Sequence, residues 1–385
     1  MHFLSIQNAA LTFISLSPFV LAQSQDNYTH AEQAAQKLNT WYKSDKGLWG
    51  YQTGWWNSAN CLTAQVDLAL ADGNAVDSVT QQLATTFQNA QVQNNNVNTV
   101  NKRMPAALRR AEKALEVRSS SPNEFKNNYY DDEGWWALAW IAAYDLTQNA
   151  TYLDAAANIF LDMTGGWPSK CGGVWWNKGH SQVNAIANEL FIASAAALAI
   201  RDTNSTQAWK SWAEQGWTWF KGSGLINDQN LINDHLDNAC KNAGNETVWS
   251  YNQGVILGGL VDLAKVTGDD SYTKEAQTLA SASIAHLADK DTHVLTEPGC
   301  EGDNGCNPTS DQFKGAYIRN LVKLNQAFPE DSYKEVLLAS GNSAWHSNDN
   351  QVQLHENWTN GKGDANTATQ SAALEALVGL LWASR

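Results

Sequence analysis

The feature that most constrains the fold is a repeated alternation between two kinds of helical segment. In one kind, apolar residues cover nearly the whole circumference, as in NAIANELFIASAAALAI and SYNQGVILGGLVDLAKV. In the other kind, apolar residues recur on one face only, as in SYTKEAQTLASASIAHLA. A helix that is apolar all round is buried, whereas an amphipathic helix covers a core with one face. The alternation therefore predicts an inner and an outer layer of helices.

Helical periodicity recurs along the chain, and no stretch alternates convincingly as a strand. The expected helices span about 27–42, 55–72, 75–92, 131–148, 151–163, 182–202, 205–221, 250–267, 269–288, 310–327, 332–346 and 364–384. The buried kind begins near residues 55, 131, 182, 250, 310 and 364, which indicates a degenerate repeat of helical hairpins. We therefore expect an all-α fold, an (α/α)6 barrel of six helical hairpins. Residues 23–385 would form this single domain, with an insertion at 94–126.

The connections between helices predict where the functional site lies. The turn that leaves a buried helix is short, as at 148–150, 202–204 and 267–269. The loop that leads into a buried helix is long and rich in Gly, Trp and Asn. All the long loops then meet at one end of the barrel. Because long loops on a rigid scaffold carry function, we expect the site at that end.

Composition narrows the class of ligand. The formal net charge of −14 disfavours nucleic acid and anionic membrane surfaces as partners. The chain has 18 tryptophans, and aromatic faces are common in ligand pockets, where they also stack on sugars. Part of these tryptophans must fill the core. A neutral carbohydrate is the ligand that fits best.

The N-terminal stretch and the N-glycosylation acceptor motifs indicate that the protein is secreted. Residues 1–22 combine an apolar stretch with the small residues Val20 and Ala22, which is typical of a signal peptide. No later segment has the roughly 18 apolar residues that a membrane span needs. Asn-x-Ser/Thr acceptors, expected in a secreted glycoprotein, occur at Asn27, Asn149, Asn204, Asn245 and Asn357.

Five cysteines in a secreted chain suggest two disulfide bonds and one free thiol. Cys300 and Cys306 bracket a short turn-rich loop, and Cys171 and Cys240 lie in successive long loops, so we expect these two pairs. Cys61 is then free and buried on a helix. The cysteines lack zinc-ligand spacing, and we expect the acidic loop 301–303 to be a solvated turn. Neither a metal nor a cofactor is expected, and nucleotide and protease motifs are missing.

Carboxylates are the remaining candidates for chemistry. The stretch NYYDDEGWWALAWIAAY, which starts at Asn128, places Asp131 and Asp132 at a helix start between aromatic residues. Helix capping would explain one aspartate well and the second less well. Two neighbouring carboxylates do not both ionise easily, so one pKa rises while the helix start stabilises the other anion. The pair therefore suits a proton donor and a nucleophile, roughly 5–6 Å apart, as in retaining glycoside cleavage.

The motif YYDDEGWWALAW resembles the Asp-Asp motif of glycoside hydrolase family 76. The blocks WWNSANCLTAQVDLAL, CGGVWWN, NAIANELFI, WSYNQGVILGGL and FKGAYIRNL also look like family blocks in family order, over almost all of the mature chain. The members of this family are (α/α)6-barrel α-1,6-mannanases. They include fungal wall proteins proposed to transfer mannan-bearing anchors onto wall glucan. The resemblance implies that Asp131 is the nucleophile and Asp132 the general acid/base. Two departures are the segment 94–126 and the final LEALVGLLWASR, which lacks an anchor signal.

Polar and aromatic residues near the starts of the buried helices are candidates for binding sugar hydroxyls. These candidates are Asn57, Asn60, Trp136, Asn184, Asn188, Tyr251, Asn252, Gln253 and Lys314. The alternative for each polar residue is a satisfied buried group or a helix cap.

The expected function is that of a secreted, monomeric, endo-acting retaining α-1,6-mannanase without a membrane anchor, which hydrolyses α-1,6-mannan. The main alternative is a cell-wall transglycosylase that uses the same aspartates, because water and a sugar compete for one covalent intermediate. A mannan-binding protein without activity is disfavoured by the intact Asp131 and Asp132. An inverting (α/α)6 enzyme would draw its acid and base from different helices.

Overall fold

The computed structural model describes residues 18–50, 52–91, 125–243, 248–301 and 305–385. Its inner helices are α2 (Trp55–Ala71), α5 (Tyr130–Thr147), α7 (Ala185–Arg201), α9 (Ser250–Thr267), α11 (Phe313–Ala327) and α13 (Thr367–Ala383). Its outer helices are α1 (Pro18–Asn39), α3 (Val76–Asn89), α6 (Ala150–Met163), α8 (Thr206–Gly222), α10 (Ser271–Leu287) and α12 (Asp331–His346). The two layers expected from the sequence are therefore present.

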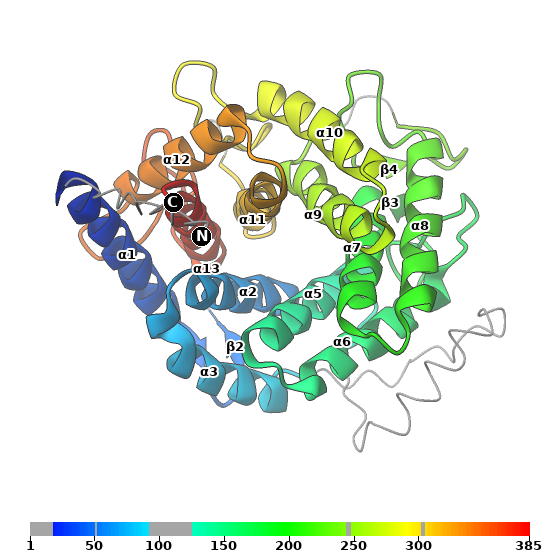
Figure 1. The fold of residues 1–385 in the computed structure, drawn as a ribbon, viewed down its shortest axis with the longest axis horizontal. Helices are drawn as coiled ribbons and strands as arrows, with labels where there is room; N and C mark the ends of the chain where they lie inside the picture. Colours follow the sequence, from blue (N-terminus) through cyan, green and yellow to red (C-terminus); the bar gives the residue numbers. More distant parts are fainter. Residues whose placement is uncertain (1–17, 51, 92–124, 244–247, 302–304) are drawn as a thin grey trace, which may run out of the picture.

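The inner helices form a closed ring (Figure 1). Each inner helix packs against the next one along the chain, and α13 closes the ring by packing against α2. The outer helix α1 packs against α13, so the two ends of the described chain lie side by side. This arrangement confirms the (α/α)6 barrel.

Three departures from the expected elements are local. Two short antiparallel sheets join loop segments: β1 (Tyr42–Lys43) with β2 (Leu48–Trp49), and β3 (Val183–Asn184) with β4 (His235–Leu236). Short 3-10 helices are η1 (Gly73–Ala75), η2 (Thr164–Gly166) and η3 (Ser310–Gln312), the last of which shortens the expected helix 310–327. Helix α1 begins at Pro18, inside the expected leader 1–22, whose first 17 residues lie outside the described part. Most of the expected insertion 94–126 also lies outside it.

One hydrophobic cluster runs through the barrel wall and includes residues of both layers. Helix α7 is buried from Ala185 to Ala199, as its uniformly apolar sequence predicts. Glycine allows the closest approach between inner helices: a Cβ on Gly254 of α9 would lie 2.4 Å from the Cα of Tyr317 in α11. The wall is thus packed tightly enough to hold the loops in fixed positions.

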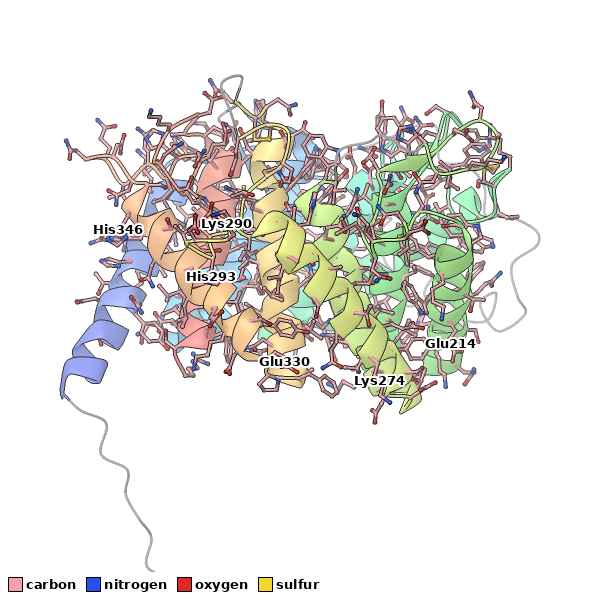
Figure 2. All side chains as sticks on the ribbon, turned by 90° about the horizontal axis from the view of Figure 1, so that it is seen from above. Glu214, Lys274, Lys290, His293, Glu330 and His346 are labelled. Atoms are coloured by element: carbon pink, nitrogen blue, oxygen red, sulfur yellow. A yellow bond between two sulfur atoms is a disulfide. The ribbon has the colours of Figure 1, made fainter. Side chains whose placement is uncertain are left out.

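The long loops gather at one end of the barrel and the short turns at the other (Figure 2). Glu330 and Lys274, which follow the short turns into α12 and α10, lie at the short-turn end. Of the acceptor asparagines, Asn149 and Asn204 are exposed in short turns, whereas Asn27 is buried and Asn245 lies outside the described residues. No helix among the described residues has the length and apolar character of a membrane span.

The cysteine pairing agrees with expectation. Cys171 is bonded to Cys240 and Cys300 to Cys306, while Cys61 is free and buried. Burial raises the pKa of the Cys61 thiol to about 12. Since the thiolate is the nucleophile, Cys61 should resist alkylation by iodoacetamide at pH 8 in the folded protein and react once the protein is unfolded. Peptide mass mapping with and without denaturant checks this, and labelling of Cys61 under native conditions would contradict its buried position.

Candidate active site

Asp131 and Asp132 are the second and third residues of α5, at the long-loop end of the barrel. The N-cap position belongs to Tyr129, so neither aspartate is the cap residue. The indole N–H of Trp176 donates to Oδ2 of Asp131 at 2.9 Å, and the side-chain amide of Asn127 donates to Oδ2 of Asp132 at 2.6 Å. Oδ1 of Asp131 is buried and has no hydrogen-bond partner within the described part of the chain. A donor or an electrophile from a ligand could occupy that side of the carboxyl.

Both carboxyls hold protons more tightly than an ordinary aspartate. Burial, and then the negative charge of Asp132, raises the pKa of Asp131 well above its usual range, against the Trp176 hydrogen bond. Burial raises the pKa of Asp132 to about 6, against the hydrogen bond from Asn127. Because two adjacent carboxylates repel each other in a partly buried position, the pair keeps one proton near neutral pH. One proton on two carboxyls is the state that an acid and a nucleophile require.

A buried ion cluster fixes the start of α5. The ammonium of Lys178 lies 2.7 Å from Oε1 of Glu133 and 2.6 Å from Oδ2 of Asp162 on the outer helix α6. Oε1 of Glu133 also accepts the backbone N–H of Asn127 at 2.8 Å. Asn127 therefore connects the ion cluster to Asp132. The connected hydrogen bonds of Lys178, Glu133 and Asn127 thus hold the Asp132 carboxyl in position.

Aromatic side chains line the barrel beneath this end. Trp135 stacks near Trp56 at a centroid distance of 6.0 Å and near Tyr251 at 6.5 Å, and Tyr251 lies parallel to Phe313 at 3.7 Å. These rings come from α5, α2, α9 and α11, so the row crosses the inner ring. The guanidinium of Arg319 lies 5.4 Å from the Trp135 ring. Trp135 and Phe313 of this row are buried, and Trp56 and Tyr251 are half-buried.

Two of the expected binding residues lie in this site. The Tyr251 hydroxyl is 3.5 Å from Oδ1 of Asp234, and the amide of Asn252 donates to the same oxygen at 3.3 Å. The negative charges of Asp234 and Asp131, after burial, raise the pKa of Tyr251, which places this tyrosine between the two aspartates. The side-chain oxygen of Asn252 is buried, and none of the residues that the structure describes donates to it. Tyr251, Asn252 and Asp234 thus form a polar group that faces the carboxyl pair.

Four other expected residues hold the protein together instead. Asn188 bonds to both the N–H and the C=O of Val174, and Gln253 does the same with Ile232, so the two amides clamp the long loops to the barrel. Asn184 caps α7, and Asn57 accepts the N–H of Gly54 and donates to Gln312. Because these hydrogen bonds occupy the amides, we assign all four to structure, which is the alternative that the sequence left open.

The last three expected residues also face protein groups. Asn60 accepts a hydrogen bond from Arg319, deeper in the barrel. Trp136 is fully buried, 4.9 Å from the ring of Phe125, and is part of the core. Lys314 is buried and pairs with Glu301. The expectation of a solvated acidic turn is therefore wrong for Glu301, whose side chain is only 5% exposed because it neutralises Lys314.

Sequence reasoning missed several residues that the structure brings to the aspartates. Trp176 and Asn127 bind the carboxyls directly, and Asp234 accepts a hydrogen bond from Asn252. Glu189 is fully buried near Asp234, and neither of its carboxyl oxygens has a hydrogen-bond partner among the described residues. Burial and the Asp234 charge raise the pKa of Glu189 well above its usual range. The CGGVWWN and NAIANELFI blocks contained Trp176 and Glu189, but only the fold shows which of their residues point to the site.

Comparison with solved structures supports the architecture. An inactive variant of α-1,6-mannanase GH76A of Salegentibacter sp. HEL1_6, in complex with α-1,6-mannotriose, superposes with a TM-score of 0.73 at 18% identity, over 93% of this chain and 100% of that chain. Dfg5 from Chaetomium thermophilum, in complex with glucosamine, superposes with a TM-score of 0.74 at 19% identity, over 93% and 90% of the two chains. At such identities the likeness establishes the shared fold.

Sequence comparison establishes the family. Mannan endo-1,6-alpha-mannosidase DFG5 of Candida albicans is 28% identical over 275 residues, which are 65% of this chain and 60% of that protein. Mannan endo-1,6-alpha-mannosidase DCW1 of Saccharomyces cerevisiae is 28% identical over 272 residues, 64% of this chain and 59% of that protein. The chain thus spans about three fifths of the length of these curated relatives. The model of glycosyl hydrolase family 76 matches residues 26–385. The chain therefore belongs to glycosyl hydrolase family 76.

Proposed function

We propose that the protein is a secreted, endo-acting, retaining α-1,6-mannanase that hydrolyses α-1,6-mannan outside the cell or in the cell wall. The observation that carries this proposal is the pair Asp131 and Asp132 at the start of α5, which share one proton. The family and the names of the relatives indicate the mannan substrate. The two disulfide bonds fit an oxidising, extracellular compartment. We propose that it acts as a monomer without a membrane anchor.

The proposed reaction has two steps. Asp131, as a carboxylate, attacks the anomeric carbon from the face opposite the leaving oxygen, while Asp132 protonates that oxygen. Asp132 then removes a proton from water, which attacks the mannosyl-enzyme and releases Asp131. Two inversions at one carbon leave the α configuration unchanged. Burial raises the pKa of both carboxyls, and the reaction starts from the state in which the shared proton is on Asp132 and Asp131 is the carboxylate.

The surrounding groups suggest how a mannosyl unit is held. The side-chain oxygen of Asn252 and the hydroxyl oxygen of Tyr251, whose hydrogen is donated to Asp234, both offer acceptors to sugar hydroxyls beside Asp131. The carboxylate of Asp234 accepts from both residues and would also accept a sugar hydroxyl. We propose Tyr251, Asn252, Asp234 and Trp176 as the substrate contacts.

The test of this function is incubation of the purified protein with linear α-1,6-mannan, and separately with α-1,2- and α-1,3-linked mannans, followed by product sizing. The proposal requires short oligosaccharides from α-1,6-mannan early in the reaction and little release from the other two polymers. Mannose alone from chain ends would contradict the endo mode. Products longer than the substrate, formed when oligosaccharide acceptors are added, would identify transfer in place of hydrolysis.

The pH dependence of kcat/KM should follow the proton shared by the two aspartates. Below the first titration both carboxyls are protonated and no nucleophile is present; above the second, both are ionised and no acid remains. We therefore expect a bell-shaped profile whose alkaline limb lies above about pH 6. Burial raises the pKa of Asp132 to about 6, and the negative charge of one aspartate makes the other lose the shared proton only at higher pH. Initial rates between pH 3 and 9 measure the profile. Constant activity up to pH 9 would exclude a carboxylic acid as the proton donor.

A further inference from the structure

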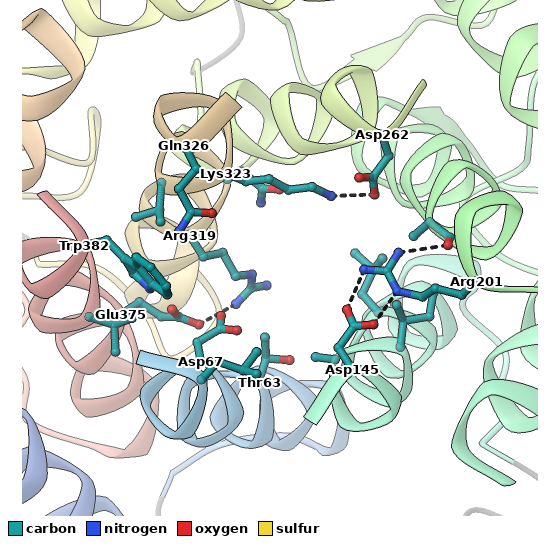
Figure 3. Close-up of a pocket in the computed structure, with 18 residues that line it drawn as sticks. Thr63, Asp67, Asp145, Arg201, Asp262, Arg319, Lys323, Gln326, Glu375 and Trp382 are labelled. Atoms are coloured by element: carbon teal, nitrogen blue, oxygen red, sulfur yellow. Dashed lines mark hydrogen bonds and ion pairs between the residues drawn. The ribbon is translucent and has the colours of Figure 1, made fainter. Parts of the chain in front are cut away.

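A cavity lies inside the barrel toward the short-turn end, and neither Asp131 nor Asp132 lines it. It has a volume of about 310 Å³ and is lined by residues from the middle and the C-terminal part of the inner helices (Figure 3). One part of its wall is apolar and includes Leu70, Leu138, Ile141, Val322 and Trp382. The row formed by Trp56, Trp135, Tyr251 and Phe313 lies toward the other end. None of the residues that we assign to mannan cleavage lines this cavity.

Every inner helix contributes a charged side chain to the cavity, and three cations are each paired with a carboxylate. These pairs are Arg201 with Asp145, Lys323 with Asp262, and Arg319 with Glu375. The remaining charged residue is Asp67 of α2, which faces the carboxyl of Glu375 (Figure 3). Four carboxylates therefore face three cations, and the wall has one excess negative charge when all are ionised.

One oxygen of the Glu375 carboxyl has no cation beside it. The side chain is 2% exposed, and Oε1 accepts from Arg319 at 3.2 Å, whereas no N–H or hydroxyl donor among the described residues reaches the buried Oε2. The neighbour of this carboxyl is the acid Asp67, which can hydrogen-bond to it only when one of the two holds a proton. A buried carboxylate oxygen without a donor costs free energy unless a proton or another donor reaches it. The parallel inner helices also end here, and their C-terminal dipoles add partial negative charge around the mouth.

We propose that this cavity binds a small organic cation, a protonated amine with a short aliphatic body. The ammonium would lie between Asp67 and Glu375 and donate to the buried Oε2, and the aliphatic part would contact the apolar wall. The cavity is far larger than a bare metal ion needs, and its apolar residues offer no ligand to one.

Protonation of the two acids supports this choice. Burial, opposed by the charge of Arg319, raises the pKa of Asp67 to about 6, and burial and the Asp67 charge raise that of Glu375 well above its usual range. Asp145 and Lys323 also act on Asp67, in opposite directions. Without a bound cation the two carboxyls therefore hold a proton more tightly than ordinary acids do. A bound ammonium would supply the same charge in place of that proton.

The test is calorimetric titration of the full chain with n-butylammonium chloride at pH 7.5, with ionic strength fixed by KCl. We expect one-to-one binding and a rise in melting temperature, neither of which n-butanol should produce. Asp67→Asn should weaken binding at least about tenfold, since a charge-assisted hydrogen bond is lost. Glu214→Gln removes a carboxylate from the outer helix α8, where it is 38% exposed, and should bind as the wild type does.

Two further measurements distinguish binding in this cavity from binding at the aspartate pair, and a lost site from a misfolded variant. Asp131→Asn should bind the amine as tightly as the wild type. The wild type itself should bind at least about tenfold more weakly at pH 5, where Asp67 is protonated; this result does not depend on a variant that folds. Absence of binding at pH 7.5, equal binding of n-butanol, or unchanged binding by a folded Asp67→Asn would each overturn the proposal.

Discussion

Asp131→Asn and Asp132→Asn should each lower kcat on α-1,6-mannan by at least about 10³-fold, because each removes either the nucleophile or the proton donor of one step. The melting temperature should stay the same or rise. Both carboxyls have raised pKa values in the folded protein, so at pH 7 their ionisation destabilises the fold, and a neutral amide removes that effect. Initial rates and thermal unfolding of both variants, measured at pH 7, check the two parts together.

Helix capping makes the opposite prediction. If an aspartate served the helix start alone, its replacement would keep activity and cost about 0.5–2 kcal/mol of stability. Asp331→Asn is the matched control, since Asp331 lies exposed in the first turn of the outer helix α12. It should keep full activity. Near-normal rates in a folded Asp131→Asn or Asp132→Asn variant would assign that aspartate to capping.

Azide rescue distinguishes the roles of the two aspartates. In Asp132→Ala, azide can attack the mannosyl-enzyme without a general base and should give an α-mannosyl azide. In Asp131→Ala, azide would replace the missing nucleophile in a single inversion and should give the β-anomer. Proton NMR of the products identifies the anomer. The reverse assignment of anomers to variants would exchange the roles, and an initial β-product from the wild type would exclude retention.

The sequence predicts the barrel because its fold signal is repeated in every hairpin. Uniformly apolar segments such as Ala185–Arg201 have only one stable environment, inside a ring, and short turns fix which neighbours pack together. The β3–β4 pairing escapes this reasoning. It joins Val183–Asn184 to His235–Leu236 through two loops, and two-residue strands have no periodicity to detect.

The candidate site is only partly predictable, because a polar residue at a helix start has two uses that look alike in sequence. Asn188 and Asn252 both follow the start of an inner helix, yet Asn188 is occupied by the Val174 backbone while Asn252 keeps an unpartnered oxygen. The path of the preceding loop decides between these outcomes. Asp234 and Trp176 lie in such loops, and no local sequence pattern predicts the path of these loops.

Lys178→Met should destabilise the protein by about 3–5 kcal/mol, because it removes the only cation bonded to two buried carboxylates in this cluster. Glu133 is fully buried and the Asp162 side chain is 5% exposed, so water cannot replace the ammonium. Urea unfolding at pH 7 measures the loss. Lys290→Met is the matched control: its pair with Asp291 is 84% and 75% exposed, and its loss should cost less than about 0.5 kcal/mol.

The destabilisation should depend on pH in a direction that identifies its cause. Burial and the charge of Asp162 already raise the pKa of Glu133, while Lys178 lowers it. Without Lys178 the folded-state pKa rises further, so the folded variant binds more protons than the unfolded chain and loses stability as pH rises above the unfolded value of about 4.3. The cost of Lys178→Met should therefore be larger at pH 8 than at pH 5. Adding Glu133→Gln, which keeps the acceptor for the Asn127 N–H, should recover part of the stability at pH 8.

An equal loss at both pH values would mean that Lys178 acts through packing rather than charge. If charge is the cause, kcat should fall together with stability at pH 8, since Asn127 transmits the position of Glu133 to Asp132.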